Sequence, residues 1–188
     1  MLKLKNKNEP RKKKVLIYGE DGSGKSTFAA KYCKENNLKP IVIDFEDTNF
    51  TDLPTLDLIF KNDIQTFSTI KNVIKELGET NEYDTIIMDG ISSLLEMLTS
   101  KAKGMAAYSE RSRRWNEILF ALENTRKNLI FIGQIDFAVI YNSEQQSSKA
   151  VIKVNAMVNE KYYCYKSGNE YRQDVKKFRT VEQNFLEA

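Results

Sequence analysis

Residues 14–27 read KVLIYGEDGSGKST, and this segment constrains the chain more than any other. An apolar run at residues 15–18 leads into residues 19–26, which follow the pattern G-x-x-x-x-G-K-S of a phosphate-binding loop, the Walker A motif. Glycines allow the backbone to close around a phosphate with its N–H groups pointing inward. This motif requires a strand before the loop and a helix after it, and the sequence has both. The pattern therefore favours nucleotide binding rather than a glycine-rich turn that matches the motif by chance.

The types of side chain in this loop indicate separate roles. Lys25 is expected to reach the β- and γ-phosphates of ATP, and the Ser26 hydroxyl to hold Mg²⁺. The start of the following helix adds the positive end of its dipole to the anion site. The predicted nucleotide contacts are Gly19, Asp21, Gly22, Ser23, Gly24, Lys25, Ser26 and Thr27.

Composition excludes several classes of protein. With 188 residues and 41% hydrophobic content, the chain suits one soluble domain with a real core. The sequence contains no histidine, which excludes a histidine-based zinc site and a Ser-His-Asp triad, and Cys33 and Cys164 are too far apart to indicate a metal site. No apolar stretch has the length of a membrane span, and no apolar segment follows the basic start, so we expect a cytoplasmic protein without a membrane partner.

The net charge of +3 is unevenly distributed. Residues 1–14 carry seven basic residues and one acidic residue, a net charge of +6, whereas the rest of the chain carries 22 basic and 25 acidic residues. The basic segment is either a solvated, flexible leader or an arm that contacts nucleic acid, and the lysine run alone does not choose between them.

Strand-like and helix-like segments alternate along the chain, which predicts an α/β fold with a mostly parallel sheet and helices on both faces. Short apolar runs predict buried strands at residues 41–45, 85–89 and 128–134, and helical spacing is found at residues 26–36, 64–77, 91–98 and 115–122. Residues 101–109 and 141–150 are polar and are expected to be loops, and a β-hairpin is expected within residues 161–178. The predicted organisation is a flexible basic arm at 1–13, one domain at 14–180 and a tail at 181–188.

Asp89 ends the apolar strand at residues 85–89, which is the arrangement of a Walker B motif. A carboxylate there can hold Mg²⁺ opposite Ser26. The alternative is that Asp89 caps the helix that follows.

Two further polar residues close predicted strands. The carboxyl ends of parallel strands meet at the ligand crevice, so Glu46 is placed to orient or deprotonate an attacking water. Asp44 and Asp47 are alternatives for this role. Gln134 ends the segment NLIFIGQ, where its amide could contact the γ-phosphate, although it could equally be an ordinary polar residue at a strand end.

The segments VIDFED, IIMDG and IFIGQI together resemble the RecA-type recombinase ATPase core. Within that superfamily the chain is similar to small phage nucleotide-binding proteins, the RecA-like single-strand annealing ATPases, over roughly residues 12–180. The resemblance implies a RecA-like P-loop fold with a C-terminal β-hairpin. It also implies that Glu46 is the catalytic glutamate and Gln134 the γ-phosphate sensor.

The same resemblance implies single-stranded DNA, further copies of the chain and phage replication or recombination proteins as partners. DNA-contacting loops would lie near residues 101–114 and 136–150. The first has interleaved cations and aromatics, which suits a single strand, although Trp115 also has the spacing of a core residue. The residues in question are Lys101, Lys103, Tyr108, Arg111, Arg113, Arg114 and Trp115. A basic residue from a neighbouring subunit would complete the ATP site, with Lys176, Lys177 and Arg179 as candidates.

Three functions fit these features. The first is a RecA-like ATPase acting on single-stranded DNA in recombination or annealing. The second is a kinase for a small substrate, with Arg111, Arg113 and Arg114 as a phosphate-clamping lid. The third is a DNA-binding module that uses nucleotide as a switch with little turnover.

Overall fold

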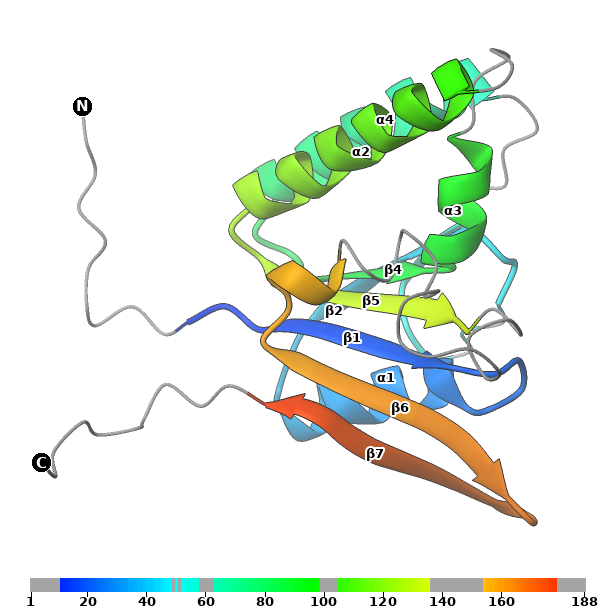
Figure 1. Ribbon diagram of the computed structural model, residues 1–188. Helices are drawn as coiled ribbons and strands as arrows, with labels where there is room; N and C mark the ends of the chain where they lie inside the picture. The colour runs from blue at the N-terminus through cyan, green and yellow to red at the C-terminus, as the bar shows by residue number, and fades with distance from the viewer. Residues whose placement is uncertain are drawn as a thin grey trace, which may run out of the picture.

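A computed structural model describes residues 11–48, 50, 52–57, 63–98, 105–135 and 154–178. The described residues form a single seven-stranded sheet with helices on both faces (Figure 1). The strands are β1 (Lys14–Gly19), β2 (Pro40–Asp44), β3 (Thr55–Asp57), β4 (Thr85–Asp89), β5 (Asn128–Gln134), β6 (Glu160–Ser167) and β7 (Glu170–Phe178). The helices are α1 (Lys25–Glu35), α2 (Asp63–Glu79), α3 (Ile91–Met97) and α4 (Met105–Asn124).

The strand order is β3-β2-β4-β5-β1-β6-β7, and all neighbouring strands pair in parallel except β6 and β7. Strand β5 therefore lies between the strand that leads into the phosphate loop and the strand that ends at Asp89. The predicted α/β fold with a mostly parallel sheet is confirmed. So are the strands at residues 85–89 and 128–134, which begin and end where the apolar runs predicted.

Each face of the sheet packs against its own helices. Side chains such as Leu16, Met88 and Phe131 form one core with α2, α3 and α4, and Val15 and Ile130 form a second core with α1. Figure 1 shows α2 and α4 lying side by side on one side of the sheet and α1 on the other. Because β2 and β4 are buried along their whole length, their sequences are continuous apolar runs rather than alternating ones.

The structure differs from the sequence prediction at two places. Residues 105–109, predicted to be a loop, form the first turns of α4, since the methionine and two alanines there are strong helix formers. Strand β3 has only three residues, too few for a periodic pattern, and was not predicted. The predicted loop at residues 141–150, residues 1–10 of the predicted arm and the tail at 181–188 lie outside the described residues.

The predicted C-terminal hairpin is confirmed. Strands β6 and β7 pair in antiparallel fashion around a two-residue turn at Gly168 and Asn169, with Ser167 opposite Glu170. Strand β6 alternates between buried and half-buried residues because one of its faces packs on α1, whereas β7 is the exposed edge of the sheet. Within the described part of the chain, no helix has the length and apolarity needed to span a membrane.

Candidate nucleotide site

The predicted phosphate loop joins the end of β1 to the start of α1. Gly24 caps the helix in a left-handed conformation, with φ of 79°, and no side chain caps the first turn. The Lys25 side chain is buried, and its Nζ donates to the carbonyl oxygens of Gly19 at 3.3 Å and Glu20 at 2.6 Å. A cation held by carbonyls beside an uncapped helix start is suited to bind an anion.

Ser26 and Asp89 lie next to each other, as the two motifs predicted. Ser26 Oγ donates to Asp89 Oδ2 at 3.0 Å. Burial raises the pKa of Asp89 to about 6; Asp44 and Glu46 push it in the same direction, while the hydrogen bond from Ser26 opposes the shift. Desolvated oxygen ligands beside further carboxylates favour a divalent cation, so this pair fits Mg²⁺.

The remaining Mg²⁺ ligands would come from phosphate oxygens and water. In the part of the chain that the structure describes, no group of three or more histidine, cysteine, aspartate or glutamate side chains gathers at one point. Magnesium commonly binds through one or two protein oxygens plus substrate phosphates and waters. The site therefore fits a nucleotide-dependent magnesium ion rather than a cage built from protein alone.

Glu46 is held by donors from two other elements. Ser93 Oγ in α3 donates to Glu46 Oε1 at 2.6 Å, and Gln134 Nε2 at the end of β5 donates to Glu46 Oε2 at 3.2 Å. Glu46 lines the same pocket as Asp89 and Ser26. Asp89 and Gln134, which end β4 and β5, are thus brought together with Glu46, which lies just beyond the end of β2.

The structure distinguishes Glu46 from the two alternative acids. Asp44 is buried within β2 and its Oδ1 accepts from the Glu46 backbone N–H at 2.9 Å, so it positions Glu46. Asp47 is exposed and does not line the pocket. Geometry therefore favours Glu46 as the group that would act on a water.

Gly90 makes room for Glu46. It lies directly after Asp89 with φ of 87°, and a Cβ on this residue would sit 2.5 Å from Glu46 Cγ. The sequence prediction missed Gly90 and Ser93. Gly90 directly follows the Asp89 strand end and could have been found as a residue near the sheet's carboxyl edge, whereas the contact of Ser93 depends on how α3 is placed.

The pocket has a volume of about 510 Å³ and is bounded by the phosphate loop, the start of α1 and the hairpin. Tyr171 in β7 lies against the loop, with its Cδ1 3.0 Å from the position a Cβ on Gly24 would take. The hairpin's part in the pocket was not predicted from the sequence. The pocket is also lined by Thr27, Phe28, Lys31, Cys164, Tyr171, Arg172 and Gln173.

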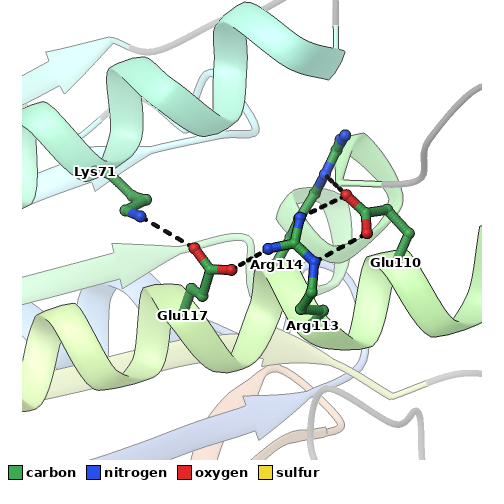
Figure 2. Close-up of polar contacts among 5 residues, drawn as sticks. All are labelled: Lys71, Glu110, Arg113, Arg114 and Glu117. Carbon is green, nitrogen blue, oxygen red and sulfur yellow. Dashed lines mark hydrogen bonds and ion pairs between the residues drawn. The ribbon is translucent and has the colours of Figure 1, made fainter.

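The cations predicted to contact DNA lie partly elsewhere. Arg113 pairs with Glu110 and Glu117, and the largely buried Arg114 pairs with Glu110, all within α4 (Figure 2). Neither arginine lies on a loop, which also counts against their use as a kinase lid.

Trp115 is fully buried in the core, as its spacing allowed. Lys101, Lys103, Arg179 and the loop at residues 136–150 lie outside the described residues, and so does the Tyr108 side chain.

Other predicted cations have partners in the chain. Lys176 pairs with Asp174 at 3.0 Å, and Lys177 Nζ donates to the Asn155 carbonyl at 2.7 Å. In the basic segment, Lys13 and Lys14 pair with Glu160 and Glu123.

The family model described as an AAA domain matches residues 11–163 of the chain. The matched stretch contains the phosphate loop, Glu46, Asp89 and Gln134. It supports a P-loop nucleoside-triphosphatase domain, whereas the RecA-like annealing branch stays a prediction. Among curated proteins, none is significantly similar to the chain.

Proposed function

The chain belongs to the AAA domain family, and from that premise we propose that it is a RecA-like ATPase whose turnover is coupled to single-stranded DNA. The observation that carries the hydrolytic part is the bridge from Gln134 to Glu46, beside the Ser26–Asp89 pair. A carboxylate at that position serves to activate water, and water is the acceptor in hydrolysis.

In the proposed mechanism, Lys25 leaves its carbonyl partners to bind the β- and γ-phosphates, and Ser26 and Asp89 hold Mg²⁺. The metal, when bound, supplies positive charge that offsets the charge of the phosphates. Glu46 orients a water and accepts its proton as the water oxygen bonds to the γ-phosphorus and the bond to the β–γ bridging oxygen breaks. Ser93 and Gln134 hold the Glu46 carboxylate in position. Gln134 also senses the loss of the γ-phosphate after hydrolysis and transmits this change to the segment that follows β5.

The coupling to DNA is supported by the resemblance to single-strand annealing ATPases and by the net charge of +6 in residues 1–14. Further copies of the chain and phage recombination proteins are proposed partners on the same resemblance. A basic segment adjoining β1 can contact phosphates of a nucleic acid, and such contacts weaken steeply with salt.

The test is the ATP turnover rate of the full chain, titrated with single-stranded DNA at about 50 mM and about 200 mM salt. We expect DNA to stimulate turnover at the lower salt and much less at the higher salt. The double variant R11A/K12A should weaken the stimulation, whereas the matched control K34A/K75A, on exposed helix positions, should not.

Each other outcome has a distinct meaning. No DNA binding in any nucleotide state would overturn the DNA part and leave an ATPase. DNA binding that follows nucleotide state without turnover would identify a nucleotide-switched module. Transfer of labelled γ-phosphate to a nucleoside monophosphate would identify a kinase.

A further inference from the structure

One wall of the pocket has no role in the proposed hydrolysis. It is formed by β7, an edge strand whose Tyr171 side chain is 62% exposed although it lies against the phosphate loop. An exposed aromatic ring over a phosphate-binding loop needs an explanation, because neither the core nor the mechanism above uses it.

The pocket is lined by residues from both sides of β1 in the sheet. Ser26, Asp89 and Glu46 lie where the γ-phosphate and metal would be bound. Tyr171 and Gln173 line the same pocket from β7, which lies on the opposite side of β1 in the strand order from β2 and β4. A nucleoside triphosphate that places its γ-phosphate at Glu46 has its ribose and base at the opposite end of the phosphate chain.

The pairing of the hairpin puts Tyr171 and Gln173 on one face. They are two residues apart on β7, and side chains at that spacing point to the same side of a strand. Gln173 lies opposite Cys164, which is buried in the core beneath α1. Both residues therefore belong to the face that looks toward the start of α1 and the loop.

We propose that Tyr171 is the platform for the nucleobase, stacking on the base of the bound nucleoside triphosphate, and that Gln173 hydrogen-bonds the same nucleoside. This inference rests on the proposed nucleotide binding and adds the part of the site that recognises the nucleoside. Every base can stack on an aromatic ring, because each has a π-face. Tyr171 therefore supplies affinity for the nucleoside, and the hydrogen bond from Gln173 supplies any preference among bases.

The test compares a ligand that has a base with one that lacks it. Calorimetric titrations of the full chain with Mg²⁺ use a non-hydrolysable ATP analogue and, separately, inorganic tripolyphosphate. Tyr171→Ala should weaken binding of the ATP analogue by about tenfold or more, the usual range for a lost base–aromatic stack. Tyr171→Phe should retain the affinity, and neither variant should weaken tripolyphosphate binding.

Val175→Ala is the matched control, because Val175 is a 60% exposed apolar residue further along β7 that does not line the pocket. It should leave both affinities unchanged. The inference is overturned if Tyr171→Ala leaves the ATP analogue unaffected or weakens both ligands equally. Failure of the proposed function differs: the unaltered chain would then bind neither ligand, or Lys25→Ala would fail to weaken either one.

Discussion

Two clusters of charged side chains differ in the groups that hold their carboxylates. In α4, Glu110 pairs with Arg113 and Arg114, and Glu117 pairs with Arg113 and with Lys71 of the neighbouring α2 (Figure 2). At the sheet's carboxyl edge, Glu46 and Asp89 are held by hydroxyl and amide donors instead of cations.

The difference is visible in the pKa values. The hydrogen bonds from Arg113 and then Arg114 hold the pKa of Glu110 down at about 2, whereas burial raises the pKa of Asp89 to about 6. Negative charge is thus neutralised within the chain in the first cluster and left for a ligand in the second. Charged residues alone do not mark a functional site; acids that line a pocket and are held by neutral donors are the better candidates.

The largest expected effect comes from removing the charge of the Glu46 carboxylate while keeping its shape. Glu46→Gln should lower ATP turnover by about 10²- to 10⁴-fold, the range for loss of a general base, with ATP affinity retained. Steady-state turnover and nucleotide titration measure the two quantities separately. Asp47→Asn, at the exposed neighbouring acid, should leave turnover unchanged.

If Glu46→Gln keeps full turnover, the water-activating role of Glu46 is wrong. If Asp47→Asn is the variant that loses turnover, the assignment shifts to the neighbouring loop acid. Either result would mean that Glu46, like the acids of α4, has no direct part in hydrolysis.

An intermediate effect is expected at Gly90, which keeps the Glu46 carboxylate in place. In Gly90→Ala the new Cβ would collide with Glu46 Cγ, and the left-handed backbone disfavours alanine. We expect turnover to fall, together with a loss of about 1–3 kcal/mol in the free energy of unfolding. Urea unfolding and turnover assays check both.

Gly78→Ala is the control for that change. Its Cβ would make only ordinary contact with Thr125 Cγ2 at 3.4 Å, and Gly78 lies in the last turn of α2. Turnover should be unaffected, and stability should change by less than about 1 kcal/mol. Equal losses of turnover in the two variants would show that Gly90 acts through stability alone.

The smallest effect concerns the cluster on α4. The folded-state pKa of Glu110 is about 2 against an ordinary 4.5, so its ionised form stabilises the fold above about pH 4.5. That contribution is lost as pH falls from 4.5 toward 2. The gap in unfolding free energy between the unaltered chain and Glu110→Gln should therefore narrow on acidification, and salt should reduce it.

Turnover of Glu110→Gln at neutral pH should match that of the unaltered chain. A gap that stays constant with pH would show that the ion pairs contribute nothing to stability. A loss of turnover would connect this cluster to the site.

Much of the fold could be predicted because burial leaves a direct pattern in the sequence. Residues 85–89 and 128–134 are continuous apolar runs because both faces of these strands are covered. The start of α4 was missed because it directly follows the lysine- and glycine-containing stretch at residues 101–104 and was interpreted together with it as one loop. Strand β3 was missed because three residues carry no periodicity. These are places where local composition and final structure are only weakly linked.

The sequence could predict the site residues that follow the ends of strands. It could not predict contacts that depend on how a helix or the hairpin packs against the sheet. Glu46, Asp89 and Gln134 each end their own apolar run, so their convergence followed from parallel topology. The contacts of Ser93 with Glu46 and of Tyr171 with the loop depend on helix and hairpin placement. The pairing of Arg113 and Arg114 did leave a signal, since Glu110 and Glu117 lie three and four residues away on the same helix.

The hydrogen bonds that build the site span long stretches of chain. Ser26 and Asp89 are 63 residues apart, and Glu46 and Gln134 are 88 apart. No short fragment can carry the site, and it exists only once β2, β4, β5 and β1 have assembled in register. A nucleotide that binds this site therefore binds the native state and not the unfolded chain. Its binding free energy is added to the stability of the whole sheet rather than to that of one loop.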